Sequence, residues 1–305
     1  MSNSSVVHIG IDISKAYLDC DLQGRTLRLP NSTQGFKKLL RLIPANAHLC
    51  MEATGGYERP LVEALHRSQV RCSVINPRQV RDFARAKGIL AKTDTIDARV
   101  LSDYGRAMDP KPSTPPEPAQ RQLAELNTLR DQFVAIQTQL INAGEHLTLP
   151  LAKRILRSQL QHIQKQIKKI EKACSDTLKS HPPLAKRDAT LQAIQGVGAV
   201  TSITLIALLP ELGTSSRGQI AALAGLAPLN DDSDPRKGQR HIRGGRSRVR
   251  RALYMATLSA IRSNGSLRSF YQRLRTAGKP PKVALIASAR KLLLFINYQL
   301  KSSTI

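Results

Sequence analysis

The sequence predicts an α/β domain at the N-terminus, followed by a region that is mostly helical. Residues 6–108 alternate strand-like and helix-like segments, a pattern typical of α/β proteins. Beyond residue 118, apolar side chains recur at steps of three and four, which is the period of amphipathic helices. Between these parts, residues 109–118 hold five prolines in ten positions, so we expect an extended linker there.

The order of elements in the N-terminal part predicts a particular kind of sheet. Three short strands come first, then a helix, a strand, a second helix and a last strand, and helices fill the remainder. The strands are expected at residues 6–13, 17–22, 26–29, 48–53 and 71–75, and the helices between them at residues 33–42 and 59–67. This order indicates a ribonuclease-H-like (RuvC-like) α/β domain over residues 1–108.

The helical part is expected to contain an arm and a second compact domain. Two long amphipathic helices are predicted in residues 119–183, before and after a break at Pro150. They favour an antiparallel hairpin or coiled-coil arm, and a layer of an ordinary helical bundle fits the same period. A mostly helical C-terminal domain is expected over residues 184–305.

The charge of the chain predicts a polyanionic partner. Its 305 residues carry a formal net charge of +25, from 47 Lys and Arg against 22 Asp and Glu. No Asp or Glu follows Asp234, whereas 17 Lys and Arg lie in the last 71 residues, so the C-terminal domain holds most of the excess. Nucleic acid is the expected partner.

Several other classes of protein are disfavoured. The apolar stretch at residues 292–296 is too short to span a membrane, and residues 1–5 lack the features of a signal peptide. The four cysteines, Cys20, Cys50, Cys72 and Cys174, lack metal-ligand spacing and are expected to be reduced, buried thiols of a cytosolic protein. The sequence has no zinc-finger, Walker or dinucleotide motif, so it predicts neither a structural metal nor nucleotide hydrolysis.

Four carboxylates in the N-terminal domain predict a metal site. Asp12 lies in an apolar strand and Glu52 ends a second strand, while Asp94 and Asp97 share one face of a helix through their i, i+3 spacing. Carboxylates that converge repel each other unless they share divalent cations, and Mg2+ prefers oxygen ligands. Asp12, Glu52, Asp94 and Asp97 are therefore the predicted ligands of Mg2+.

Some acids also have structural interpretations. For Asp94 alone, the alternative is a helix N-cap. Asp19 and Asp21 alternate on one face of the second strand, which is typical of charges on an edge strand, and they are left out of the predicted site.

Two features of the C-terminal domain predict contacts with nucleic acid. Gly196-Val197-Gly198 lies between two apolar helical stretches, as in a helix-hairpin-helix whose amides approach a phosphate; the alternative is a tight helix-helix turn. Residues 236–251 hold eight basic residues in sixteen and no acid, and their glycines favour a loop along the phosphate backbone before a helix opens near Val249. The predicted contacts are Gly196, Gly198, Arg236, Lys237, Arg240, Arg243, Arg246, Arg248, Arg250 and Arg251.

Taken together, several motifs resemble one known family. These motifs are Gly10-Ile11-Asp12, Met51-Glu52-Ala53-Thr54-Gly55, Val74-Ile75-Asn76-Pro77, Lys92-Thr93-Asp94-Thr95-Ile96-Asp97-Ala98 and Arg250-Arg251-Ala252-Leu253-Tyr254-Met255. They are similar to those of the DEDD transposases of bacterial insertion sequences, the family numbered 110 with its subgroup 1111, and of the related Piv-type DNA invertases. The resemblance covers nearly the whole chain. It implies excision and insertion of a DNA element by strand cleavage, exchange and rejoining.

The resemblance also implies a serine nucleophile from the C-terminal domain, which works with the carboxylates in a composite centre and forms a transient phosphoserine link. Aligned on the downstream Gly-Gly-Arg, Ser233 is the candidate, although the family's Asp-Ser-Gly is here Asp232-Ser233-Asp234, followed by Pro235. Ser247 is the alternative nucleophile, and the structural interpretation of Ser233 is a turn residue.

The partners implied by the resemblance are double-stranded DNA, at the element ends and the target, and a noncoding guide RNA from the element. It further implies a homo-oligomer, a dimer of dimers, that acts at the nucleoid in the bacterial cytoplasm. Two other function classes stay open. A nuclease of the Holliday-junction type would share the carboxylates but cut with activated water, and a non-catalytic nucleic-acid-binding protein would share only the charge and the hairpin.

Overall fold

The chain forms two compact units, which divide between Pro115 and Pro116. The computed structural model describes residues 6–89, 91, 93–229, 232–233, 236–237, 241–263 and 265–302. The first unit combines a sheet with helices, and the second is built mainly from helices. The predicted α/β N-terminal part and helical C-terminal part are thus confirmed.

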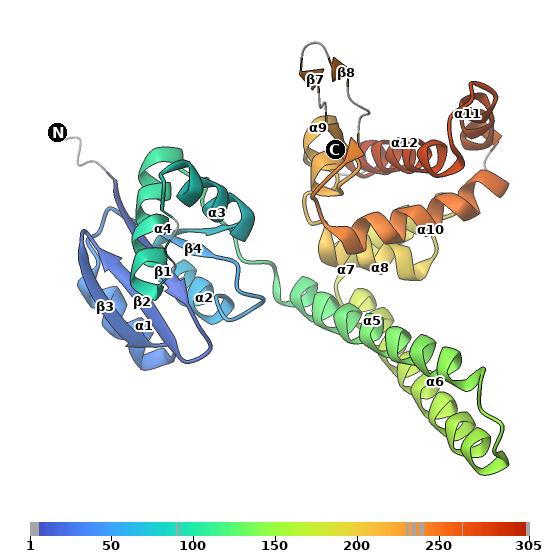
Figure 1. Cartoon of the computed structure of the whole chain (residues 1–305), viewed down its shortest axis with the longest axis horizontal. Helices are drawn as coiled ribbons and strands as arrows, with labels where there is room; N and C mark the ends of the chain where they lie inside the picture. Colours follow the sequence, from blue (N-terminus) through green and yellow to red (C-terminus); the bar gives the residue numbers. More distant parts are fainter. Residues whose placement is uncertain are drawn as a thin grey trace. The chain divides into compact units, whose positions relative to one another are not determined.

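A mixed five-stranded sheet forms the centre of the first unit (Figure 1). The strands are β1 (Val7–Ile13), β2 (Tyr17–Leu22), β3 (Arg25–Pro30), β4 (Ala47–Glu52) and β5 (Arg71–Ile75). In the order β3-β2-β1-β4-β5, the first three strands are antiparallel, and β4 and β5 run parallel to β1. The carboxyl ends of β1, β4 and β5 therefore lie at one edge of the sheet.

Helices cover both faces of this sheet. On one face, α1 (Thr33–Leu42) and α2 (Arg59–Arg67) pack on the odd-numbered residues of β1, such as Ile9 and Ile11. On the other face lie α3 (Pro77–Ala86) and α4 (Asp94–Met108). A Cβ at Gly10 would lie 1.9 Å from the carbonyl oxygen of Ala98, so α4 contacts β1 directly because position 10 has no side chain.

The interpretation of Asp19 and Asp21 as edge-strand charges is wrong. Their strand, β2, lies between β3 and β1, and both residues are only 5% exposed. Asp21 accepts a hydrogen bond of 2.9 Å from the backbone N–H of Gly24, and Asp19 is paired with Arg28. Because a buried carboxylate is costly without a partner, these contacts explain why both acids are tolerated in the interior.

The proline-rich segment after α4 is partly fixed to the sheet. Residues 109–117 form neither helix nor strand, as the prolines predict. The backbone N–H of Ser113 donates to the carbonyl of Cys72 at 2.8 Å, and its hydroxyl accepts from the N–H of Val74 at 2.9 Å. The first half of the segment therefore follows the edge strand β5.

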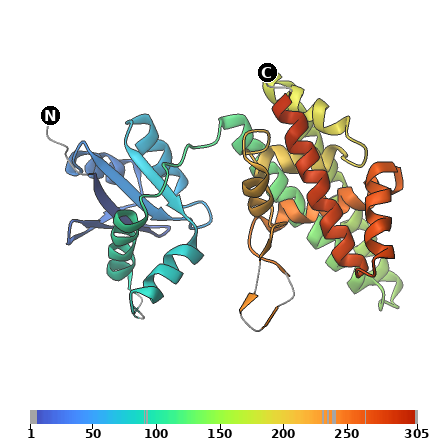
Figure 2. The same ribbon diagram turned by 90° about the horizontal axis from the view of Figure 1, so that it is seen from above.

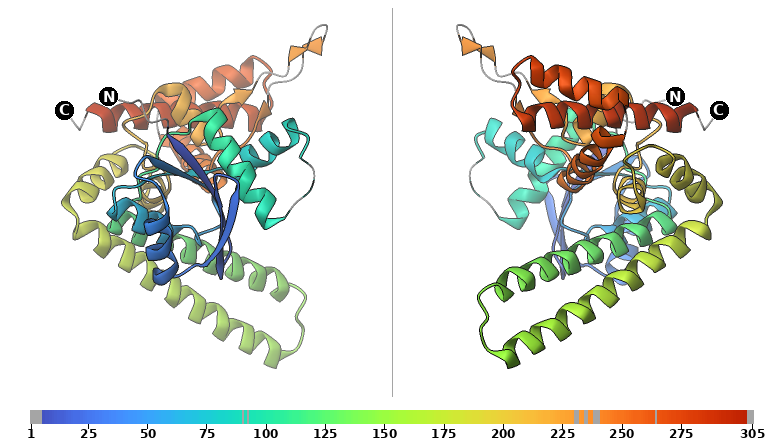
Figure 3. Two further views of the ribbon diagram at one scale, coloured as in Figure 1. Left: turned by 90° about the vertical axis from the view of Figure 1, so that its left-hand side faces the viewer. Right: turned by 90° about the vertical axis from the view of Figure 1, so that its right-hand side faces the viewer.

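Two long helices form an antiparallel hairpin in the second unit (Figures 1 and 3). They are α5 (Pro118–Gly144) and α6 (Pro150–Lys179), and Arg130 of α5 binds Glu171 of α6 at 2.8 Å. Their ends nearest residues 118 and 179 join the core of the unit. Around the connection between the helices, large apolar side chains are exposed, namely Ile141, Leu149, Leu151 and Ile155.

The remaining helices of the second unit share one apolar core. They are α7 (Pro182–Gln192), α8 (Ala199–Leu208), α9 (Arg217–Leu223), α10 (Ser247–Ser263), α11 (Gly265–Thr276) and α12 (Pro281–Ser302). α12 packs alongside α11 and against α10 (Figure 2). Between α9 and α10, β6 (Pro228–Leu229) pairs with β9 (His241–Ile242), and β7 (Asp232–Ser233) pairs with β8 (Arg236–Lys237).

α12 is longer than the apolar stretch expected from the sequence. By length and composition its 22 residues could cross a membrane, so the expectation that this stretch is too short is wrong. Half of the apolar part of this helix is nevertheless buried inside the unit, where Leu293 and Ile296 are fully inaccessible to solvent. Burial of this kind is typical of a core helix, and α12 packs here as one.

Candidate active site

One face of the sheet carries a row of side chains beneath α4. Gly10 of β1 pairs in register with Cys50 of β4, and Asp12 and Glu52 lie two residues further along on the same face. The backbone N–H of Gly10 donates to Ser102 Oγ at 2.7 Å, which fixes α4 along β1. The first turn of α4 thereby reaches the end of the sheet where Asp12 and Glu52 lie.

The other three predicted acids form part of the electrostatic surroundings of Asp12. Burial is the main cause that raises the pKa of Asp12 to about 6, and the negative charges of Asp97, Asp94 and Glu52 raise it further. A hydrogen bond from the backbone of Ile13 acts in the opposite direction and lowers the pKa. A carboxylate exerts such an effect only at short range. The structure therefore brings Asp12, Glu52, Asp94 and Asp97 into one carboxylate cluster.

The N-terminus of α4 is positioned by its own cap. Thr93 is the N-cap, since its hydroxyl accepts from the N–H of Ile96 at 3.3 Å and its carbonyl from the N–H of Asp97 at 2.8 Å. The interpretation of Asp94 as the N-cap is therefore wrong, because Asp94 is the first helical residue. Both acids of α4 lie in its first turn, where the helix dipole favours negative charge.

Arg28 of β3 is part of the site, and sequence reasoning missed it. Its guanidinium donates to both oxygens of Asp19, at 2.8 and 3.0 Å, and to Asp94 at 2.7 Å. Asp19 is the cross-strand partner of both Asp12 and Arg28, so a fifth carboxylate lies beside the cluster with its charge compensated. The sequence does contain a signal for the pairing of Asp19 with Arg28. The turn at Gly24 joins β2 and β3 as a hairpin, and the alternation of side chains along both strands places these two residues opposite each other.

Glu58 holds the loop that follows β4. Its carboxylate accepts hydrogen bonds of 2.9 to 3.1 Å from the N–H groups of Thr54 and Gly56 and from the Thr54 hydroxyl. Burial opposes the ionisation of Glu58, but these bonds and its own backbone N–H hold its pKa below the usual value. The loop directly behind Glu52 is thus fixed by a charged side chain.

The carboxylate cluster suits a hard divalent cation. All of its side-chain donors are oxygens, the ligands that Mg2+ and similar ions prefer. Burial and the repulsion from neighbouring acids together raise the pKa of Asp12, and a bound cation removes the cost of that repulsion. The four acids therefore fit a divalent metal as its ligands.

Three partly buried arginines among those predicted to bind nucleic acid make contacts inside the second unit. Arg246 binds Glu211 through two hydrogen bonds of 2.5 and 2.6 Å, and Arg248 binds Asp131 of α5 at 2.8 Å. Arg250 donates to the carbonyl oxygen of Gly244 at 2.8 Å. These contacts fix the beginning of α10 against its neighbours.

The other basic residues of this segment lie differently. Arg243 is exposed, and Arg251 is exposed with one contact of 3.2 Å to Asp131. Arg236 and Lys237 form β8, and Arg240 lies outside the residues that the structure describes.

The two candidate serines belong to short elements on either side of these basic residues. Ser233 ends β7 and pairs in register with Arg236, while its neighbours Asp234 and Pro235 lie outside the described residues. Ser247 is exposed and begins α10. Both serines belong to the second unit.

Gly196-Val197-Gly198 forms the connection between α7 and α8. Gly196 has a φ of 92°, and a Cβ there would lie 2.5 Å from the Cβ of Ala260 in α10, so both the backbone angle and the close packing require glycine. Gly198 is the N-cap of α8, and Val197 is buried. The turn therefore packs on α10 with the N-terminus of α8 beside it.

Comparison with known proteins assigns the family. Residues 9–148 match a family model for the DEDD transposases of IS110, whose description is "Transposase". Residues 188–272 match a second family model, whose description is "Transposase IS116/IS110/IS902 family". The chain belongs to this family of transposases. The family inferred from the sequence motifs is thus confirmed.

Two relatives match the transposase over most of its length. The pilin gene-inverting protein of Moraxella lacunata is 28% identical over 304 residues, 95% of this chain and 94% of the relative. The pilin gene-inverting protein of Moraxella bovis is 29% identical over 306 residues, with the same shares. An uncharacterized 43.6 kDa protein of the insertion element IS110 from Streptomyces coelicolor is 27% identical over 177 residues, 57% of this chain and 42% of the relative.

The two matched segments of the transposase contain the predicted site residues. The first segment includes the carboxylate cluster, and the second includes the turn at Gly196, the basic residues and both candidate serines. Membership of the family makes the protein an enzyme of DNA recombination.

Proposed function

We propose that the transposase excises and inserts a DNA element by Mg2+-dependent cleavage, exchange and rejoining of strands. The observation that carries this proposal is the carboxylate cluster, in which burial and the charges of the three other acids raise the pKa of Asp12. Mg2+ bound there would stabilise the charge that develops during phosphoryl transfer. A ribonuclease-H-like (RuvC-like) first unit is part of the proposal and is supported by the strand order β3-β2-β1-β4-β5.

Residues around the cluster keep its ligands in place. Arg28 holds the carboxylate of Asp94, and the cap at Thr93 fixes the helical turn that carries Asp94 and Asp97. Glu58 fixes the loop behind Glu52. Such positioning matters because misplacement by about 1 Å can cost 100-fold in rate.

Ser233 is the proposed nucleophile. Its oxygen forms a bond to a DNA phosphorus, a phosphorus–oxygen bond of the strand breaks, and the departing sugar oxygen takes up a proton. The serine proton passes to a carboxylate or to water. Rejoining reverses this step, because a sugar hydroxyl attacks the same phosphorus and releases the serine. Alignment with the family, whose second model matches residues 188–272, supports this assignment.

Double-stranded DNA, at the element ends and the target, is the proposed substrate of the second unit. A helix-hairpin-helix formed by α7, the turn at Gly196 and α8 would bind its backbone, together with the exposed Arg243 and Arg251. An element-encoded guide RNA is a second proposed partner, and membership of the family alone supports it. A protein that acts on these partners would work at the nucleoid in the cytoplasm.

The working unit is proposed to be a homo-oligomer, a dimer of dimers. The exposed apolar side chains near the tip of the α5–α6 hairpin support it: Leu149 is 68% exposed, Leu151 58% and Ile155 55%. Exposed apolar groups gathered at one place often mark a contact between proteins.

The covalent link separates this function from its alternatives. The full chain is incubated with Mg2+, the element's RNA and labelled DNA that spans the element junction, and is then denatured. A covalent adduct that is absent in Ser233→Ala supports the proposal, whereas an adduct that persists there and is absent in Ser247→Ala assigns the nucleophile to Ser247. Nicked DNA without an adduct indicates a junction nuclease, and bound but uncut DNA indicates a binding protein.

Inversion of a DNA segment is a second candidate outcome of the same chemistry. It is favoured by the pilin gene-inverting proteins, which match 95% of this chain. Plasmids that carry the element ends in direct or in inverted orientation distinguish the two outcomes, since excision needs the first arrangement and inversion the second.

A further inference from the structure

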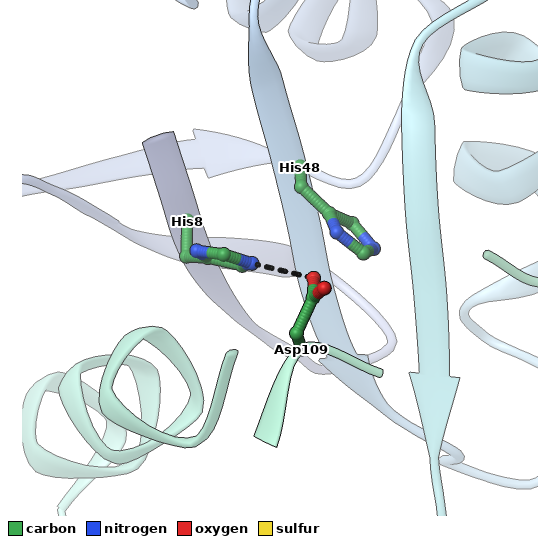
Figure 4. A group of neighbouring side chains, drawn as sticks. All are labelled: His8, His48 and Asp109. Carbon is green, nitrogen blue, oxygen red and sulfur yellow. Dashed lines mark ion pairs between the residues drawn. The ribbon is translucent and has the colours of Figure 1, made fainter. Parts of the chain in front are cut away.

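A second group of metal-ligand residues lies at the opposite end of β1, β4 and α4. His8 and His48 are partners in the parallel register of β1 and β4, four residues before Asp12 and Glu52. Asp109 is the C-cap of α4. Figure 4 shows the three side chains pointing toward one another, and one ligand atom from each lies within 4.8 Å of the other two. We call His8, His48 and Asp109 the histidine group.

A layer of buried, uncharged groups separates the histidine group from the carboxylate cluster. It consists of Gly10 on β1, Cys50 on β4 and Ser102 and Gly105 on α4. Burial, helped by the charge of Asp109, raises the pKa of the Cys50 thiol to about 12, so this thiol stays protonated. Four residues of extended strand span about 13 Å. The two groups are therefore separate.

The hydrogen bonds around His48 define which of its nitrogens carries a proton. Ser73 Oγ lies 2.8 Å from the carbonyl oxygen of Lys111 and 3.1 Å from that of Pro110, so its proton is donated to a carbonyl. Ser73 Oγ then accepts from His48 Nε2–H at 2.8 Å. His48 Nδ1 is left with a lone pair, and it is buried without a hydrogen-bond partner among the described residues.

His8 presents a second such nitrogen. Its Nε2 is buried, has no hydrogen-bond partner in the described part of the chain and lies 3.6 Å from Asp109 Oδ1. A simple ion pair between His8 and Asp109 would leave His48 Nδ1 unsatisfied, and 3.6 Å is too long for a hydrogen bond. One cation between the three side chains would satisfy both nitrogens and the carboxylate together.

We propose that His8 Nε2, His48 Nδ1 and one carboxylate oxygen of Asp109 bind a divalent transition-metal ion of the zinc type. Two imidazoles and a carboxylate are typical ligands of Zn2+, whereas Mg2+ favours oxygen ligands alone. The Asp109 side chain is 74% exposed, which leaves a coordination position open to water. Ser73 supports the site from behind, as partners of metal-bound histidines commonly do.

Such an ion would join the beginnings of β1 and β4 to the end of α4. Asp109 is also the residue at which the proline-rich segment leaves α4, and its φ of 37° places it in the left-handed region. The ion would therefore fix the point from which that segment starts. This role is structural and does not depend on the proposed recombination chemistry.

Zinc titration of the full chain tests the site. The protein is stripped with a chelator and titrated calorimetrically with Zn2+ in excess Mg2+, which occupies sites made of oxygen ligands. One Zn2+ per chain is expected, with a rise in thermal midpoint, and Co2+ in its place should give the visible absorption of a four-coordinate site. Amide exchange at Ser113 should slow when Zn2+ is bound.

Asp109→Asn is the decisive variant, because Asn tolerates left-handed backbone angles and the position is exposed, so the fold should persist. Zn2+ affinity should fall by about 10- to 100-fold in Ser73→Ala and further in Asp109→Asn and His8→Gln. Asp82→Asn, which removes an exposed acid from α3, and Asp12→Asn are the controls and should bind Zn2+ as wild type does. Failure of the wild type to bind Zn2+, or unchanged affinity in Asp109→Asn and His8→Gln, would overturn the proposal.

Discussion

Replacement of Asp12 by Asn is expected to stabilise the metal-free transposase at neutral pH. Burial and three neighbouring carboxylates raise the pKa of Asp12 from 3.8 to about 6. A group whose pKa is raised by folding contributes stability that is fully present below its unfolded pKa and is lost as the pH rises through its folded pKa. Above pH 6, the folded metal-free protein therefore carries an ionised carboxylate at a cost that Asn avoids.

The size of the effect follows from the two pKa values. Their difference corresponds to about 3 kcal/mol for a fully buried group. Because Asp12 is only partly buried, screening by solvent reduces this to about 1 kcal/mol. With Mg2+ at about 100 times its dissociation constant, the wild type should gain about 2.7 kcal/mol and the variant less, so the order of stability should reverse.

Denaturant unfolding of both proteins at pH 4 and pH 8, with a chelator or with Mg2+, measures these differences. The variant should gain stability over wild type at pH 8 in chelator and not at pH 4. Asp82→Asn serves as a charge-matched control, because its exposed pairs with Arg78 and Arg85 contribute little. Destabilisation of the metal-free Asp12→Asn protein at pH 8 would refute the inferred repulsion.

Three further variants test other parts of the structure. Gly10→Ala should displace α4 from β1, destabilise the first unit by about 1 to 3 kcal/mol and weaken Mg2+ binding. Gly218→Ala, where a Cβ meets nothing within 4 Å, should leave Mg2+ binding unchanged. Equal melting points and affinities for Gly10→Ala and wild type would contradict the close contact. Arg28→Gln should destabilise the fold at neutral pH, because it leaves Asp19 buried without its cation, and exposed Arg25→Gln on the same strand should not; urea midpoints decide between them. Joint replacement of Leu149 and Leu151 by Ser should lower the oligomeric state in sedimentation without a loss of stability, and an unchanged oligomer would exclude the hairpin tip as the contact.

Local sequence patterns were sufficient to predict the elements of the first unit. The five strands were expected from apolar alternation and turn residues, and each is present within a residue or two of its expected bounds. The gathering of the four acids could also be expected, because each lies at the end of a strand or in the first turn of a helix, while their role as metal ligands stays a prediction. Such features depend on neighbours close in sequence.

Contacts between distant residues could not be predicted in this way. The partners of Arg246 and Arg248 are Glu211 and Asp131, so residues that suggested a binding surface in the sequence also hold the second unit together. The length of the apolar segment in α12 was underestimated. Arg290 and Lys291 interrupt it, so the sequence shows two short apolar stretches where the structure has one long helix.

The histidine group was missed for a related reason. Its members stand at positions 8, 48 and 109, and searches for metal sites by spacing detect ligands that are close in sequence. Only the parallel register of β1 with β4 and the length of α4 bring these residues together.

The contact between α4 and β1 also limits how the chain can change in length. α4 carries acids in its first turn and Asp109 at its end, and it is held between them by Ser102 and Gly105. Inserting one residue into an α-helix rotates everything beyond it by about 100° and shifts it by about 1.5 Å. An insertion within α4 would therefore turn either the acids or Asp109 away from the sheet. Substitutions can accumulate on the outer surface of this helix, while its number of residues is fixed from both ends.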